Sequence, residues 1–235
     1  MLRFLSFGSG SSGNCYLLYT DTDCLMIDCG VGIRSLKKSF HNYGLQMKMV
    51  HNILITHDHA DHVKSVGSIS GDLQLPVYTT SDVHLGISKN WCVRRKIDHE
   101  FTRELIKDQE VQIGEFYVTP FSVPHDSTDC VGYSIRHDDL YFTLVTDCGH
   151  ITDNIARYIS ISNYLVIEAN HEPEKLANGP YPRHLKERIS GSNNHPELAK
   201  KTIESMLRNR GIIAGKDFLL DVLKRKTPSE VFNLV

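Results

Sequence analysis

Residues 57–62 have the sequence HDHADH, which limits what this chain can fold into more than any other segment because it places three histidines and two aspartates in six positions. They follow directly on the apolar, strand-like residues 51–56. Imidazole and carboxylate groups are ligands for borderline and hard divalent metals. At a strand end, His57 and His59 can point to one position, and Asp61 and His62 to a second one nearby. The spacing therefore favours a two-metal centre over a four-ligand structural zinc site or a solvated loop.

Two later residues are candidates to complete such a centre. His125 closely follows the strand-like residues 115–123, and Asp147 directly follows the strand-like residues 141–146. An aspartate in this place can bridge two cations through its two carboxylate oxygens. Taken alone, each residue would more often belong to a turn. Together with residues 57–62, both become predicted ligands.

Composition excludes several classes of protein. The chain has 235 residues, of which 40% are apolar, so it can bury a sizeable core. The formal net charge of −2 argues against a globally basic nucleic-acid binder, although a local basic patch stays open. No apolar run approaches the ~20 residues of a membrane span, and no signal segment opens the chain. We therefore expect a soluble, cytoplasmic protein that does not bind membranes.

The six cysteines form no CxxC pair, which argues against a thiolate zinc ribbon and against a thioredoxin-like redox site. Several of them stand beside apolar, strand-like residues. We expect them to be reduced and to act as small hydrophobic side chains in the core.

Strand-like and helix-like patterns alternate irregularly along the chain. The expected strands lie at residues 2–7, 15–19, 24–28, 51–56, 77–79, 115–123, 131–136, 141–146 and 164–168. The expected helices lie at residues 31–42, 151–158, 182–189 and 197–208, and closing strands at 219–223 and 230–234. Residues 8–14 are rich in glycine and serine and are expected to form a turn, or else an anion-binding loop. Meandering strands with helices between them predict a layered α/β (α+β) domain.

The HxHxDH motif, the lone His125 and the later Asp147 resemble the metallo-β-lactamase-fold hydrolases. The resemblance implies a four-layer αββα sandwich, formed as one domain over residues 1–235, with a metal site at one edge of the paired sheets. It implies ligands as follows: His57, His59 and His125 for the first metal, and Asp61 and His62 for the second, with Asp147 bridging. Asp28, in the early Asp-x-Gly turn, would support the metal-binding loop.

A narrower resemblance covers most of the chain. Residues 9–17, 27–30, 56–59, 168–171 and 179–182 are similar to the YycJ-like (WalJ-like) bacterial branch, which is associated with phosphodiester hydrolysis, including exonuclease action on DNA. This implies two divalent ions. Histidine-rich ligation favours Zn²⁺, while mixed sites with open positions also accept Mn²⁺ or Fe²⁺.

The resemblance also implies roles for residues outside the ligand set. Asp58 would act as the base or the orienter of the attacking water. His171 would contribute to catalysis, beside the metals or at the substrate. Tyr181 and Arg183 would bind the substrate phosphate at the rim of the site.

The late part of the chain departs from the branch pattern. Two expected His-Leu-Ser segments are absent, and residues 188–191 run straight into residues 192–198. We therefore expect a family segment to be missing near Gly191 and Ser192, through deletion or as a disordered loop. The second metal would lack its last imidazole, so that site would be weak, completed by water, or empty. His195 and His171 are the candidate substitutes.

Three functions compete. The first is a phosphodiesterase or nuclease, which residues 89–96 (KNWCVRRK) favour because four cations and an aromatic side chain could hold a strand and stack a base. The plainer interpretation of that segment is a solvated loop with Trp91 packed into the body. The second function is a small-molecule hydrolase of the same fold, acting on a thioester, lactam or lactone. The third is a non-catalytic metal-binding regulatory module.

Overall fold

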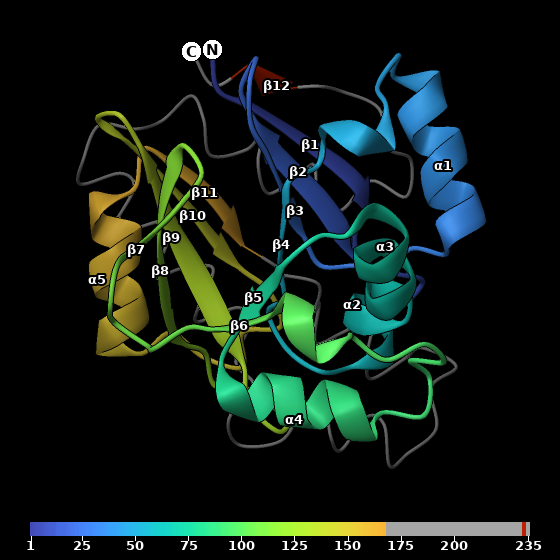
Figure 1. Cartoon of the computed structure of the whole chain (residues 1–235). Coiled ribbons are helices and arrows are strands. Elements are labelled where there is room, and N and C mark those ends of the chain that lie inside the picture. The colour runs from blue at the N-terminus through green and yellow to red at the C-terminus, as the bar shows by residue number, and fades with distance from the viewer. Residues whose placement is uncertain (168–231, 234–235) are drawn as a thin grey trace, which may run out of the picture.

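The computed structural model describes residues 1–167 and 232–233, which form two facing β-sheets with helices on their outer sides (Figure 1). The larger sheet has seven strands in the order β12-β1-β2-β3-β4-β5-β6. Its strands are β1 (Arg3–Gly8), β2 (Cys15–Tyr19), β3 (Cys24–Ile27), β4 (Asn52–Leu54), β5 (Val77–Thr79), β6 (Thr102–Glu104) and β12 (Phe232–Asn233). The strands from β12 to β3 pair antiparallel, and those from β3 to β6 pair parallel.

The smaller sheet has five strands in the order β11-β10-β9-β8-β7. They are β7 (Val111–Ile113), β8 (Phe116–Ser122), β9 (Val131–His137), β10 (Leu140–Val145) and β11 (Tyr164–Ile167). The described helices are α1 (Ile33–Asn42), α2 (Ala60–Val63), α3 (Val66–Leu73), α4 (Ser81–Lys89) and α5 (Asp153–Ile161), with 3₁₀ turns at Met47–Met49 and His99–Phe101.

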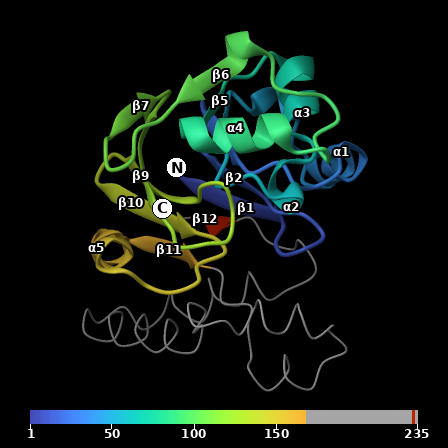
Figure 2. The ribbon, with the colours of Figure 1, turned by 90° about the horizontal axis from the view of Figure 1, so that it is seen from below.

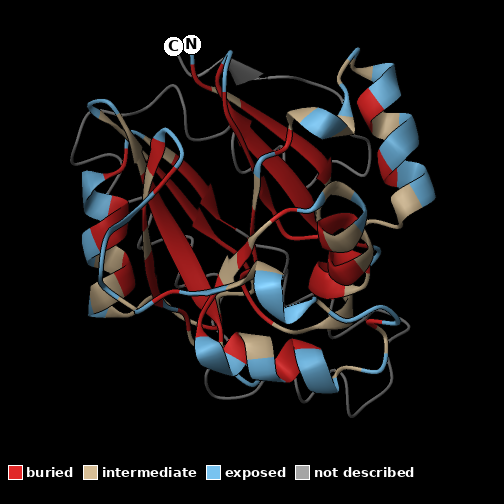
Figure 3. Ribbon diagram, viewed as in Figure 1, coloured by how far each residue is buried: buried red, intermediate tan, exposed pale blue. Residues whose placement is uncertain are grey.

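The inner strands of the larger sheet are buried on both faces (Figure 3). In β1, Phe4 belongs to the core between the sheets, while the next residue, Leu5, belongs to the core under the helices. This alternation explains why β2 is apolar throughout, since neighbouring side chains of a strand point to opposite faces. Across the gap between the sheets, the rings of Phe4 and Phe142 lie 5.2 Å apart. The main core thus lies between the two sheets.

Helices cover both outer faces, as Figure 2 shows from below. Residues of α1, α3 and α4 pack on the larger sheet. On the smaller sheet, α5 buries Ile155, Tyr158 and Ile159, and the ring of Tyr158 stacks on Phe121 of β8 at 4.4 Å. Thr152 caps α5 by accepting a hydrogen bond from the backbone N–H of Ile155. The expected four-layer αββα arrangement is confirmed.

Three of the described helices, α2, α3 and α4, were not expected from the sequence patterns. Helix α3 contains Gly67 and Gly71, which lower helix propensity. A Cβ at Gly67 would collide with the backbone carbonyl of Arg95, and one at Gly71 with the Arg95 guanidinium. The backbone of the segment after α4 therefore requires a glycine at Gly67, and this packing overrides local propensity, whereas at Gly71 only the flexible end of the Arg95 side chain is in the way. Helix α5 begins at Asp153, two residues later than expected, at its Thr152 cap.

Several expected elements cannot be compared. The helices at residues 182–189 and 197–208 and the strand at 219–223 lie outside the described residues. Within the expected closing strand at residues 230–234, β12 pairs antiparallel with β1. All six cysteines are free, and four of them are buried, as expected. None of the described helices has the length and apolar character needed to cross a membrane.

Candidate metal centre

His57 is held between the two sheets. It follows β4 and forms an isolated antiparallel bridge with Cys130, just before β9. The backbone N–H of Val131 donates to the carbonyl of Thr56 at 2.9 Å. His59 is the N-cap residue of α2, and the N–H of His62 donates to the His59 carbonyl at 2.9 Å. This tight turn brings His62 back toward His57, with ring centroids 4.0 Å apart.

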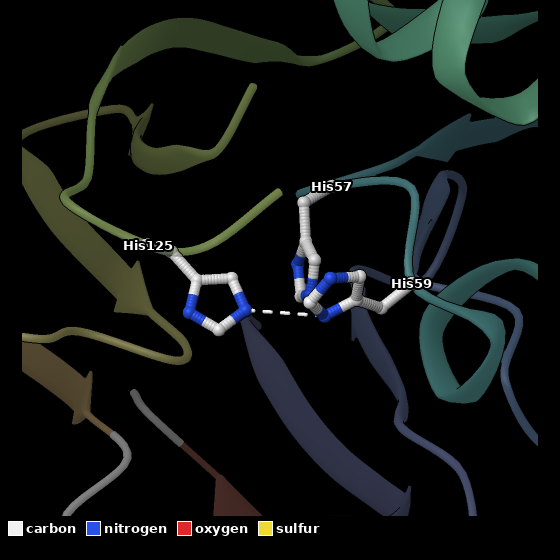
Figure 4. Close-up of side chains that lie close together, drawn as sticks. All are labelled: His57, His59 and His125. Atoms are coloured by element: carbon white, nitrogen blue, oxygen red, sulfur yellow. Dashed lines mark hydrogen bonds between the residues drawn. The ribbon is translucent and has the colours of Figure 1, made fainter. Parts of the chain in front are cut away.

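His57, His59 and His125 converge in a first group that could hold a metal ion (Figure 4). Their ligand nitrogens lie within 4.8 Å of one another. His125 comes from the loop between β8 and β9, and its Nε2 lies 3.2 Å from Nδ1 of His59. Nitrogen donors in this arrangement suit a borderline divalent ion such as Zn²⁺.

His57, His62 and Asp147 form a second such group, so His57 belongs to both. The Oδ2 atom of Asp147 lies 3.0 Å from Nε2 of His62 and 3.8 Å from Nε2 of His57. Asp147 follows β10 with a φ of 50°, a left-handed conformation that aspartate tolerates better than most residues. The backbone thus turns the carboxylate toward the histidines immediately after the strand.

One buried atom tests whether a cation fits. Within the described part of the chain, Nε2 of His57 is buried and has no hydrogen-bond partner. Leaving such a group unsatisfied costs about 1–3 kcal/mol. Because His57 belongs to both groups, a cation bound among these donors would satisfy this nitrogen. The residues present therefore fit a divalent metal.

The charges around the site place His57 and Asp147 in ligand-competent states and keep a proton on His62, which a metal ion would have to displace. Burial, together with the neighbouring His62, lowers the pKa of His57, so His57 is neutral, as a metal ligand must be. Burial also lowers the pKa of His62, but the carboxylates of Asp28 and Asp147 outweigh it and raise that pKa. Burial alone would raise the pKa of Asp147, but its hydrogen bond to His62 and the nearby histidine charges lower it. His62 and Asp147 thus form an ion pair in which the imidazole is buried and the carboxylate is partly exposed.

Asp28 fixes the orientation of His62 from behind. Its Oδ2 lies 2.7 Å from Nδ1 of His62, and its Oδ1 accepts the backbone N–H of Thr56 at 2.9 Å. This leaves Nε2 of His62 facing Asp147. A carboxylate that holds the far nitrogen of a ligating imidazole sets its tautomer and raises its basicity. The supporting place implied for Asp28 by the sequence is confirmed.

The loop of residues 8–14 supports the HDHADH segment, which the sequence did not reveal. Asn14 is buried, with its Nδ2 2.7 Å from Nε2 of His62. Its backbone N–H donates to the carbonyl of Asp61 at 2.7 Å. A Cβ at Gly30 would collide with that same carbonyl. Because an asparagine after a glycine is typical of an ordinary turn, the pattern carries no signal of this contact.

The two aspartates of the motif differ in their surroundings. The Oδ2 atom of Asp61 lies 3.9 Å from Nε2 of His62, yet Asp61 belongs to neither group described above. The carboxylate of Asp58 instead accepts the Thr128 backbone N–H at 3.2 Å and its hydroxyl at 2.6 Å. A Cβ at Gly86 of α4 would collide with it. Through Thr128, Asp58 connects the loops of His59 and His125, and its predicted role as the base or the orienter of the attacking water stays a prediction.

The remaining predicted site residues lie outside the described residues. These are His171, Tyr181 and Arg183, together with the expected missing segment near Gly191 and Ser192 and the candidate substitute His195.

Comparison with known proteins identifies relatives over nearly the whole chain. Residues 24–204 match the family model described as "Beta-lactamase superfamily domain". The exodeoxyribonuclease YycJ of Bacillus anthracis is 26% identical over 268 aligned residues, covering 98% of each chain. The exodeoxyribonuclease WalJ of Streptococcus pneumoniae serotype 2 (strain D39) is 27% identical, covering 99% of this chain and 86% of that protein. The similarity to the YycJ-like (WalJ-like) branch expected from the sequence is confirmed.

Solved structures share the fold at low sequence identity. The structure of Zn²⁺-bound PqqB from Methylobacterium extorquens superposes with a TM-score of 0.67 and 14% identity, covering 89% of this chain and 96% of that one. At this identity, the likeness bears on the fold alone.

Proposed function

Because this chain belongs to the beta-lactamase superfamily, we propose that it is a metal-dependent phosphodiesterase with exonuclease action on DNA. The observation that carries the proposal is the convergence of His57, His62, Asp147, His59 and His125 from separate segments on one place. The names of YycJ and WalJ, which are similar over nearly the whole chain, support DNA as the substrate.

We propose two divalent ions at this place. The ligands would be His57, His59 and His125 for the first ion, and His62 and Asp61 for the second, with Asp147 between them. Bound ions would lower the pKa of a water toward about 7 and neutralise charge on the phosphate. The donor set supports Zn²⁺ first, with Mn²⁺ or Fe²⁺ as alternatives. The second ion would be held more weakly, because the late His-Leu-Ser segments are absent.

The chain's own residues prepare the site for this reaction. Asp28 holds the His62 ring, and Asn14 holds the backbone at Asp61. Asp58 keeps the loops of His59 and His125 together through Thr128. We also propose that His171 acts near the reacting group. Tyr181 and Arg183 would bind the substrate phosphate.

The test is a substrate panel with Zn²⁺ or Mn²⁺ added. Bis-p-nitrophenyl phosphate and end-labelled DNA should be hydrolysed, while nitrocefin and a thioester should not. His59→Ala should abolish turnover and lower metal content, because it removes a first-ion ligand. The matched control is His41→Ala, which changes an exposed histidine in α1 and should behave as wild type.

Two results would contradict the proposal. Hydrolysis of the lactam alone would indicate a small-molecule hydrolase. Stoichiometric metal with no turnover of any substrate would indicate a regulatory metal-binding module.

A further inference from the structure

Trp91, directly after α4, is the single tryptophan of the chain, and 87% of it is exposed. It is the most exposed of the large hydrophobic residues in the described part of the chain. The expectation that it packs into the body is therefore wrong. Large aromatic side chains are usually buried or used at interfaces, because an exposed ring forgoes the gain from burial. The exposure of Trp91 requires an explanation.

The turn that presents Trp91 is firmly anchored. The preceding residue, Asn90, donates from Nδ2 to the Asp58 carbonyl at 2.6 Å and accepts the Cys92 N–H at Oδ1 at 2.9 Å. Its own carbonyl accepts a hydrogen bond from Nζ of Lys96 at 2.6 Å. The backbone N–H of Asn90 also donates to the Gly86 carbonyl at 2.9 Å, so its N–H, its carbonyl and its side chain are all hydrogen-bonded. The indole of Trp91 therefore projects into solvent from a well-anchored turn.

The same bond places the turn beside the candidate metal centre. Asp58 lies between His57 and His59 in the sequence, and its carbonyl is the acceptor for Asn90. With standard backbone dimensions, the Cα of Trp91 lies within roughly 10 Å of that carbonyl. This corresponds to about three base steps of 3.4 Å along one strand. A strand with a phosphate at the metals could therefore reach Trp91.

The cations of this turn divide into two kinds. Arg95 is paired with Asp72 at 2.8 Å, and Lys96 donates to the backbone of Asn90. Lys89 and Arg94 are exposed, and neither side chain has a hydrogen-bond or ion-pair partner among the residues that the structure describes. They flank Trp91 in the sequence and offer free positive charge for phosphates. An aromatic ring between cations suits single-stranded nucleic acid, whose bases stack while its phosphates are neutralised.

We propose that Trp91, Lys89 and Arg94 form a strand-contact surface that stacks one unpaired base of a DNA strand whose phosphate lies at the metal centre. This inference rests on the proposed function and names the form of the substrate, which is a single-stranded or frayed end. Stacking on Trp91 sets affinity and the position of the strand, while the chemistry takes place at the metal centre.

The single tryptophan makes binding directly visible. Phosphorothioate oligodeoxythymidine, which resists hydrolysis, should quench the intrinsic fluorescence of the protein, because base stacking changes the surroundings of the indole. An abasic oligonucleotide of equal length, which carries the same charge, should quench it much less. Equal quenching by both would overturn the stacking, since the bases would then contribute nothing.

Substitutions separate this surface from the reaction centre. Trp91→Ala should raise the KM for single-stranded DNA about tenfold with little change in kcat, and Trp91→Phe should recover most of the loss. Turnover of bis-p-nitrophenyl phosphate should be unchanged, because this small substrate does not reach Trp91. The matched control is Ile106→Ala, which removes another exposed hydrophobic side chain and should leave the KM unaltered.

The charges are tested by salt dependence. Lys89→Ala and Arg94→Ala should each reduce the slope of log Kd against log salt concentration by about 0.7, the value for one phosphate contact on a single strand. Arg95→Ala should leave the slope near the wild-type value, because the Arg95 guanidinium is already paired with the Asp72 carboxylate. A larger effect at Arg95 than at Arg94 would contradict the assignment.

The outcomes distinguish this inference from the proposed function. If no phosphodiester is hydrolysed, the proposed function fails. If DNA is hydrolysed, but the oligonucleotide does not quench the fluorescence and Trp91→Ala does not change the KM, the inference alone fails. If the fluorescence instead follows protein concentration and sedimentation shows a dimer, Trp91 contacts a second copy of the chain, and the strand-contact surface is overturned.

Discussion

His57 is the residue on which both groups of metal-ligand candidates depend. Its Nε2 is buried without a hydrogen-bond partner in the described structure, while the other histidines around it are oriented by carboxylates or by one another. A single imidazole therefore connects two possible ion positions. We therefore expect the residues that orient its neighbours to affect how well such ions are held.

Asp28→Asn tests this control. The amide keeps the volume of the carboxylate but removes the charge that holds Nδ1 of His62. Loss of such support typically lowers metal affinity about 10–100-fold. Competition with a chromophoric chelator would measure the affinity. Asp138→Asn, which changes an exposed carboxylate in a similar left-handed conformation, is the control and should leave the affinity unaltered.

Asp58 distinguishes positioning from base catalysis. Asp58→Ala should retain metal but lower kcat about 100-fold, because a shift of about 1 Å in the loops of His59 and His125 can cost that much. Asp58→Asn should recover much of the activity, since an amide oxygen still accepts the Thr128 hydroxyl bond. Steady-state kinetics with metal analysis would show this. If Asp58→Asn were as inactive as Asp58→Ala, the role would be that of a base.

At the scale of elements, the centre is built where strands of both sheets end. The turn after β3 passes directly beneath the HDHADH segment, where the N–H of Cys29 donates to the His62 carbonyl at 2.6 Å. Gly30 allows this approach because it has no side chain. The short strands thus place the loops that follow them at the same edge of the sheets, and close backbone contacts hold these loops in position.

Gly30→Ala should therefore destabilise the protein by more than about 2 kcal/mol, because the new methyl group meets the Asp61 carbonyl and must displace the turn. Urea unfolding followed by circular dichroism would measure the change. Gly32→Ala is the control two residues away, where nothing lies within 4 Å, and it should change stability by less than about 1 kcal/mol. Similar losses for the two variants would contradict the contact.

At the scale of the whole molecule, three cores stack across the layers: one under α1, α3 and α4, one between the sheets, and one under α5. Most cysteines lie inside these cores. Burial raises the pKa of Cys15, Cys29 and Cys130, so their thiols stay protonated and unreactive.

Thiol titration tests this layering. In the folded protein, a disulfide reagent at pH 8 should modify Cys92 first, because it is partly exposed. Cys148 should react much more slowly, because burial raises its pKa to about 12. The buried thiols should react only in denaturant. Cys92→Ser should remove the fast phase; a fast phase that persisted would show that a buried thiol is accessible.

Much of this centre was predictable from the sequence, because ligand chemistry resides in residue types and their place at strand ends. HDHADH after an apolar strand, His125 and Asp147 could be recognised in this way, as could most strands, since strands buried on one or both faces leave a clear apolar pattern. The glycine-rich helix α3 could not be recognised, because packing against Arg95 overrides its propensity.

Only the tertiary structure decided which way each side chain of the motif faces. The sequence separated Asp61, a predicted ligand, from Asp58, but it did not show that the Asp58 carboxylate binds Thr128 while that of Asp61 lies near His62. Asn14 reaches the site from a loop 48 positions away in the sequence, and Trp91 stays in solvent on a turn anchored to Asp58. These orientations depend on contacts between distant segments, which form only when the sheets and loops pack. The residue type determines whether a side chain can bind a metal or a base, and tertiary packing determines which neighbours it faces.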